Sequence, residues 1–223
     1  MREGRSKNKT LKEQVYQELR KSIINGDFSN KIFTEADLCE KFKVSTPPVR
    51  EALIELSKDN FIKSIPRHGY TITPCSVKEA LDILDVRMDI ELNQWERTKL
   101  ILTDKKINQF KRNIPKQIKT RTTINYAFHY DRTMKFHLSL CELGENDCAT
   151  KSLEAVFKSY SRFFRFYYEN AISDGTEKKE GTGYHEAMLH ALEEHDYNLF
   201  GTLLKADIET VKEKVRKLLV LEN

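Results

Sequence analysis

The sequence lacks several features that define well-known classes of protein. No apolar run among its 223 residues approaches the roughly 18 that a membrane-spanning helix needs, and the opening MREGRSKNKT contains no apolar secretion signal. The four cysteines form no CxxC pair, which argues against a zinc knuckle or a redox motif. We therefore expect a cytoplasmic protein with reduced thiols and no membrane contact.

A strong net charge is also missing. The chain carries a formal charge of only +4 although 32% of its residues are charged, so it is not a bulk polycation. Residues 1–74 hold 14 Lys and Arg against 10 Asp and Glu, which accounts for the whole excess. Any contact with nucleic acid would therefore come from local clustering in this N-terminal third.

Short helices are predicted at the start of the chain. After a flexible basic arm over residues 1–10, an apolar helical period runs over 11–25 and ends at Gly26, a typical C-cap. A second helix begins at Thr34, where Asp37 completes an approximate capping box, and we expect it to bury Leu38 and Phe42.

The stretch VSTPPVREAL (residues 44–53) predicts a third helix after a short turn. Pro47 and Pro48 suit the first turn, where N–H groups have no intrahelical partners, and Ser45 is a favourable N-cap. The spacing of a buried face is shown by Val49, Ala52, Leu53 and Leu56. Arg50 then lies on the exposed side, and the two helices form a helix-turn-helix candidate.

The runs FIKSI and YTIT, separated by the basic turn 66–69, predict a β-hairpin directly after the third helix. A hairpin in this place is typical of a wing. Residues 11–74 are therefore expected to form a winged helix-turn-helix DNA-binding domain.

The rest of the chain shows long helical periods, little proline and no strand signal. We expect helices at about 76–101, 103–119, 122–144, 147–172, 178–194 and 196–220. The chain is thus predicted to be mainly α, with an all-helical bundle over residues 75–223.

These motifs resemble a known family. VYQELRKSIINGDF, followed by LCEKFKVSTPPVREALIELSKDNFIKSIPRHGYTIT, is similar to the winged helix-turn-helix of the GntR family of bacterial transcription regulators. FHLSLCELGEN and HEAMLHALEEHD resemble motifs of the FCD effector domain, which occurs in the FadR-like branch. The resemblance implies that residues 75–223 bind an effector and form a dimer.

The residues expected to contact DNA lie at the start of the third helix and in the wing. Side chains in the first turns of a helix reach base edges, while N–H groups and hydroxyls suit phosphate. These candidates are Ser45, Thr46, Pro47, Arg50, Arg67, His68 and Gly69. The family usually has arginine where this chain has Thr46 and threonine where it has Pro47, which suggests a shifted operator sequence.

The resemblance also implies a metal set. Metal-binding members use four ligands, and the matching positions here are Thr133, His137, His185 and Asp207. Two histidines and one carboxylate suit one divalent transition metal per chain (Zn, Ni, Mn or Fe), held by His137, His185 and Asp207. The alternative is that these side chains bind an effector without metal.

Three arginines are further effector-binding candidates. Arg87 and Glu91 match the family's R-x-x-x-E, which is either an i, i+4 ion pair or a clamp for an effector carboxylate. Arg162 and Arg165 lie in the aromatic stretch SYSRFFRFYYENA and could hold an acid group.

Together these features predict a DNA-binding transcriptional regulator, specifically a repressor. It would bind a palindromic operator as a homodimer, under the control of a small organic-acid effector in the helical domain. Two alternatives stay open: a helical metal-dependent enzyme fused to a DNA-binding head, and a winged helix used for protein contact only. We expect no enzyme, because no positioned acid or base accompanies the metal set.

Overall fold

The computed structural model describes residues 10–28, 32–114, 126–173 and 183–218, without the side chains of Tyr126 and of residues 165–173. The chain divides into two compact units, Met1–Pro74 and Cys75–Asn223. Within the described residues, no helix is both long enough and apolar enough to cross a membrane. All four cysteines are free thiols.

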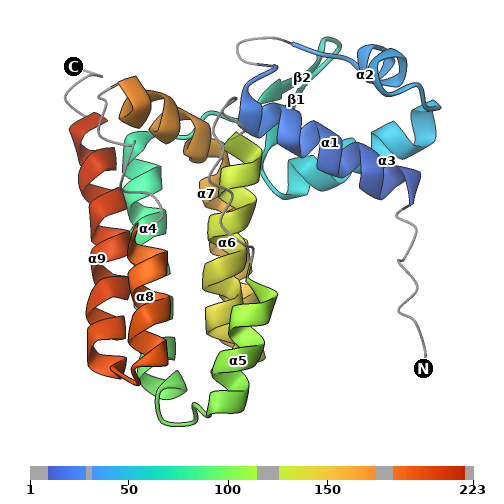
Figure 1. Cartoon of the computed structure of the whole chain (residues 1–223). Coiled ribbons are helices and arrows are strands. Elements are labelled where there is room, and N and C mark those ends of the chain that lie inside the picture. The colour runs from blue at the N-terminus through green and yellow to red at the C-terminus, as the bar shows by residue number, and fades with distance from the viewer. Residues whose placement is uncertain (1–9, 29–31, 115–125, 174–182, 219–223) are drawn as a thin grey trace, which may run out of the picture. The chain divides into compact units, whose positions relative to one another are not determined.

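The first unit consists of three helices and a two-stranded antiparallel sheet (Figure 1). Its elements are α1 (Leu11–Asn25), α2 (Glu35–Phe42), α3 (Thr46–Lys58), β1 (Ile62–Ile65) and β2 (Gly69–Ile72). In the sheet, Ile62 pairs with Ile72 and Ile65 with Gly69. Helix α3 packs against α1, α2 and β1 and so lies at the centre of the unit.

Local signals explain where the first helices begin and end. Thr10 and Glu13 form a reciprocal capping box at the start of α1, so Thr10 belongs to the helix cap and not to the predicted arm, whose residues 1–9 lie outside the described chain. Gly26 ends α1 with φ +86°, a left-handed conformation that glycine adopts without strain.

The predicted buried face of α3 is confirmed, because Val49, Ala52, Leu53 and Leu56 are all completely buried. On α2, Leu38 is buried as expected, but Phe42 is only half-buried, so that prediction was wrong for Phe42.

The second unit is a helical bundle of α4 (Val77–Thr98), α5 (Asp104–Asn113), α6 (Tyr126–Glu142), α7 (Asp147–Ser173), α8 (Gly183–Glu193) and α9 (Tyr197–Leu218). Helix α4 contacts α6, α7 and α9, and α8 packs along α9 (Figure 1). The prediction that α5 reaches residue 119 was wrong. Ile114 is already extended, with ψ 145°, because it precedes Pro115 and this position disfavours the helical conformation.

An apolar core holds α4, α5, α6, α8 and α9 together. Trp95 of α4 stacks on Phe200 of α9 at a centroid distance of 3.9 Å and donates its ring N–H to the carbonyl of Tyr197 at 3.2 Å. This packing fixes α4 against α9, and both helices carry polar side chains into the site described below.

Candidate functional site

The start of α3 is exposed and unusually poor in N–H groups. Ser45 is the N-cap residue, but its side chain makes no capping hydrogen bond. The expectation of a side-chain cap was therefore wrong, because the second and third helical residues, which would donate to it, are Pro47 and Pro48. The Ser45 hydroxyl is consequently not used by its own helix, and the Thr46 hydroxyl lies 3.8 Å from the thiol of Cys39.

Arg50 lies on the exposed side of α3 and is held by α2. Its Nε donates to Oε1 of Glu35 at 3.1 Å, and its Nη2 donates to Oε2 at 2.9 Å. The Arg50 side chain is 62% exposed, whereas that of Glu35 is 26% exposed. The guanidinium is thus oriented by one carboxylate while most of it faces solvent.

The wing turn places Arg67 and His68 at the surface. Gly69, expected to let the backbone approach DNA closely, also has a structural reason to be glycine. Its φ is +120°, and a Cβ there would lie 2.5 Å from the carbonyl oxygen of Phe33. That close approach allows Phe33 and Tyr70 to exchange backbone hydrogen bonds of 3.0 and 2.9 Å, which tie the wing to the segment before α2.

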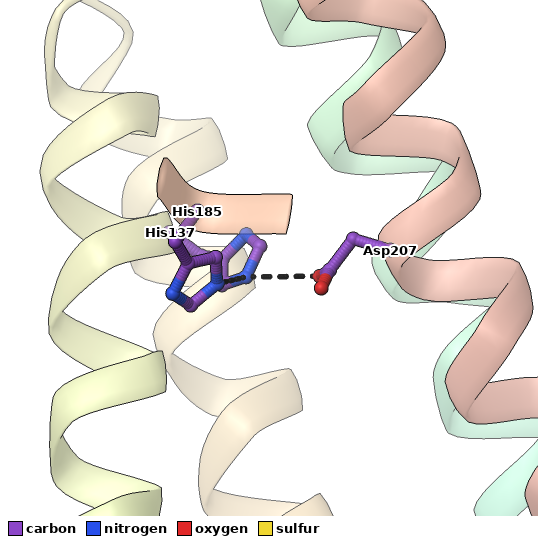
Figure 2. A group of neighbouring side chains, drawn as sticks. All are labelled: His137, His185 and Asp207. Atoms are coloured by element: carbon purple, nitrogen blue, oxygen red, sulfur yellow. Dashed lines mark hydrogen bonds and ion pairs between the residues drawn. The ribbon is translucent and has the colours of Figure 1, made fainter. Parts of the chain in front are cut away.

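In the second unit, side chains from four helices meet in a polar cluster. His137 comes from α6, His185 from α8 and Asp207 from α9, and their ligand atoms lie within 4.8 Å of one another (Figure 2). Arg87 and Glu91, one turn apart on α4, complete the set, which we call the His137 cluster. The structure therefore brings together residues that are up to 120 positions apart.

His137 is the completely buried centre of this cluster. Its Nδ1 is 2.6 Å from Oε2 of Glu91, and its Nε2 is 2.8 Å from Nη2 of Arg87. A neutral His137 with its proton on Nδ1 donates to Glu91 and accepts from Arg87. Protonation of Nε2 would exchange the Arg87 contact for one with Asp207, whose Oδ2 lies at 3.3 Å.

The cluster shifts the pKa of each side chain through burial and charge. Burial lowers the pKa of His185 to about 4, so this imidazole is neutral at neutral pH. Burial opposes charge on Asp207, but the hydrogen bond with His137 and the neighbouring histidine and arginine charges hold its pKa well below the usual range. Burial likewise opposes charge on His137, but Glu91 and Asp207 raise its pKa.

The chemistry of the donor set suits a divalent transition metal, and so do the two spacings that involve His137. Two ligands about 2.05 Å from a tetrahedral metal are about 3.3 Å apart. His137 Nε2 lies 3.2 Å from His185 Nε2 and 3.3 Å from Asp207 Oδ2. Glu91 orients His137 through Nδ1, as outer carboxylates do for metal-bound histidines. A metal bound to the Nε2 lone pair of His137 would displace Arg87 Nη2, which contacts that atom here.

Three other residues, Thr133, Arg162 and Arg165, were also predicted to bind the effector. Thr133 is half-buried on α6, and the described contacts include none between it and the cluster. The Arg162 side chain is buried and pairs with Glu79 of α4. Arg165 is on α7, at a position whose side chain is not described.

Two aromatic contacts of the cluster were not anticipated from the sequence. Phe136 stacks on His185 at 4.0 Å with an interplanar angle of 9°. Phe157 lies under the Arg87 guanidinium, 5.1 Å from its central carbon. The FH pair was the available signal for Phe136, whereas Phe157 lies just before the aromatic stretch that was singled out, and no local pattern shows which polar side chain an aromatic ring would contact.

Comparisons with known proteins agree with this architecture. Residues 11–72 match the model of the bacterial regulatory proteins of the gntR family, and residues 82–210 match the FCD domain model. A solved structure described as E. coli McbR/YncC has a TM-score of 0.70 at 17% identity and covers 95% of this chain and 99% of its own. A putative GntR transcriptional regulator from Rhodococcus sp. RHA1 has a TM-score of 0.66 at 16% identity, covering 92% and 97%.

Curated relatives are named as transcriptional regulators. The uncharacterized HTH-type transcriptional regulator YdhC of Bacillus subtilis is 27% identical over 64% of this chain and 65% of its own length, just under two thirds. The HTH-type transcriptional repressor RspR of Escherichia coli is 22% identical over 82% and 86%. The Uxu operon regulator of Haemophilus influenzae is 27% identical over 94% and 84%.

The relatives and the matched family are regulators of transcription and not enzymes. The two family models together cover both units. The chain therefore belongs to the GntR family of bacterial transcription regulators and combines the family's winged helix-turn-helix with an FCD domain.

Proposed function

We propose that this DNA-binding regulator is a cytoplasmic repressor that binds a palindromic operator as a homodimer. The names of relatives support this assignment, since RspR and two gluconate operon proteins are called transcriptional repressors. A two-fold dimer presents two winged helices, each of which reads one half-site.

The observation that carries the DNA-reading role is the exposure of Arg50 on a helix whose opposite face is completely buried. The guanidinium offers paired donors to a guanine edge. Nearby, the Ser45 and Thr46 hydroxyls suit phosphate, and Pro47 shapes the helix start. In the wing, Arg67 and His68 reach the adjacent groove beside Gly69.

The test compares Arg50→Ala with Lys58→Ala, which removes an exposed cation from the far end of α3. Binding to an operator selected in vitro should weaken roughly 5- to 150-fold for Arg50→Ala at moderate salt and change little for Lys58→Ala. Equal affinity of the wild type and Arg50→Ala would contradict the assignment. Affinity that does not fall with salt would favour a winged helix used for protein contact.

For the second unit, we propose that the His137 cluster receives a small organic acid together with one divalent transition metal. A metal ligand must be a neutral imidazole, and with both imidazoles neutral Glu91 and Asp207 outnumber Arg87, so the buried cluster then carries one excess negative charge. Because the pKa of His137 is raised, metal binding would displace a proton from it. An acid alone would add to that negative charge. A divalent cation held by His137, His185 and Asp207 reverses it, and the effector carboxylate then restores neutrality.

Effector binding at this cluster would alter the spacing or mobility of the two reading heads. Such control requires a different affinity of the acid for the DNA-bound and free states. Arg87 is the side chain we expect to turn to the effector carboxylate. Thr133, Arg162 and Arg165 stay predictions as effector contacts, and the pairing of Arg162 with Glu79 favours a structural role.

Native mass spectrometry of the full chain, purified without chelator or metal-binding tag, tests this proposal. We expect two chains, about one transition metal per chain and a co-purified acid. Asp207→Asn should lose the metal, whereas Asp89→Asn, an exposed carboxylate on α4, should keep it. A metal-free dimer that still holds an acid would contradict the proposed metal site. Arg87 and the histidines would then bind the acid directly.

A further inference from the structure

The contact between Arg50 and Glu35 has a geometry that restricts how the arginine can read a base. Nε and Nη2 both donate to the same carboxylate, at 3.1 and 2.9 Å. Two parallel hydrogen bonds fix the plane of a guanidinium, whereas one bond allows it to rotate. Arg50 is therefore held in one orientation before any DNA is present.

Glu35 is well placed to act as this anchor. It is the first residue of α2, where the helix dipole favours a negative charge. The helix start is itself fixed, because Thr34 and Asp37 form a capping box there. The Glu35 side chain is largely covered while the Arg50 side chain is largely exposed, so the anchor lies on the protein side of the pair.

The remaining donors of Arg50 form a defined edge. The two hydrogen bonds use Nε–H and one N–H of Nη2, which leaves the Nη1 and outer Nη2 N–H groups. This two-donor edge matches O6 and N7 of guanine. A phosphate oxygen would also accept from it, but the Glu35 carboxylate beside it repels phosphate. The pair therefore favours a base edge over the DNA backbone.

We propose that Glu35 is a specificity-determining residue that positions Arg50 for guanine and weakens contacts with phosphate alone. The inference rests on the proposed reading of DNA by α3. Removal of the Glu35 charge should therefore lower discrimination between operator and other DNA without lowering the affinity for other DNA. Loss of a purely structural residue would lower the affinity for both kinds of DNA.

The experiment uses the full-length protein, an operator selected in vitro with the wild type, and a scrambled duplex of the same length. Glu35→Gln should lower the ratio of operator to scrambled affinity roughly 5- to 150-fold, while scrambled DNA binds equally or more tightly. The matched control is Glu55→Gln on α3, which removes a half-exposed carboxylate paired with Lys12 at 2.5 Å and should leave the ratio unchanged.

Further variants show whether the effect acts through Arg50. In the Arg50→Ala background, Glu35→Gln should have no additional effect on the ratio. Glu35→Asp keeps the charge on a side chain that is shorter by one methylene, and should give an intermediate ratio even if the glutamine variant folds poorly.

An unchanged ratio for Glu35→Gln would overturn the inference, whether both affinities fall equally or neither changes. A ratio that falls equally in the Arg50→Ala background would overturn it as well. Failure of the wild type to bind any duplex in a salt-dependent manner would instead overturn the proposed function, and the inference with it. The two failures are thus distinguishable.

Discussion

Each unit of this protein contains an arginine that donates through Nε to a glutamate, and the two pairs have opposite surroundings. In the first unit, the Arg50 side chain is 62% exposed beside Glu35. In the second, Arg87 is 3% exposed and Glu91 1% exposed, with a contact of 2.6 Å. The same kind of ion pair is thus exposed to solvent in the first unit and buried in the second.

This difference decides what each pair can do. An exposed ion pair contributes little stability, because water and salt compete with it, and the donors of Arg50 that Glu35 does not use remain open to a DNA base. A buried pair is costly to break, because either charge left alone is strongly unfavourable. Arg87 and Glu91 therefore hold His137 in position, and Arg87 can turn only to a ligand that supplies a replacement negative charge, whereas Arg50 is open to a ligand at once.

The largest expected effect on the free energy of unfolding comes from loss of the buried Arg87–Glu91 pair. Glu91→Ala leaves Arg87 without its carboxylate and His137 without its Nδ1 partner, and should lower the free energy of unfolding by about 3–5 kcal/mol. Trp95 is the single tryptophan and lies in the core of the second unit, so its fluorescence in a urea titration reports this unit.

The matched control is Asp89→Asn, an exposed carboxylate on the same helix, which should change the free energy of unfolding by less than about 0.5 kcal/mol. A similar small change for Glu91→Ala would show that the buried pair is no more important than a surface one. The comparison between the two units would then lose its basis.

A smaller effect is expected from pH. The pKa of His185 is 6.5 in the unfolded chain and about 4 in the folded one, so between these values the unfolded state binds the proton more readily. Stability contributed by this residue is therefore complete above pH 6.5 and decreases as the pH falls towards 4, by about 3 kcal/mol in total.

The His185 contribution is isolated by comparing wild type with His185→Gln in urea titrations at pH 7, 6, 5 and 4, again by Trp95 fluorescence. The wild type should lose stability more steeply than the variant over this range. Parallel curves would mean that His185 titrates equally in the folded and unfolded states.

The sequence predicted local features well and long-range contacts poorly, for a physical reason. Capping residues and apolar periods act within a few positions, so the buried face of α3 and the end of α1 at Gly26 followed from the residues alone. Glu35 and Arg50 are 15 positions apart, and Arg87 and Asp207 are 120 apart. No local pattern encodes such contacts.

The resemblance to a family supplied part of what local patterns lack. It placed His137, His185 and Asp207 in one set, and these three do converge. It could not show that Arg87 contacts His137 Nε2, because that contact depends on how α4 packs against α6. The absent side-chain cap at Ser45 was a local error. The two prolines were present in the sequence, but they remove the N–H groups that would donate to Ser45 only if the helix begins at Thr46.

The smallest expected effect on stability is the loss of the exposed pair. Arg50→Ala, Glu35→Ala and the double variant should leave the denaturant midpoint of the full chain nearly unchanged, because solvent screens the largely exposed Arg50. Hydrogen exchange in peptides from α2 and α3 measures the first unit directly, and we expect protection there to change by less than a factor of about 3.

A double-mutant cycle separates the pair from each residue's other contacts. Strong coupling in that cycle would mean that the pair stabilises the fold despite its exposure, and the contrast with the buried Arg87–Glu91 pair would then lose its basis. Weak coupling together with a large change in operator discrimination would show that the exposed pair is retained for recognition and contributes little to the fold.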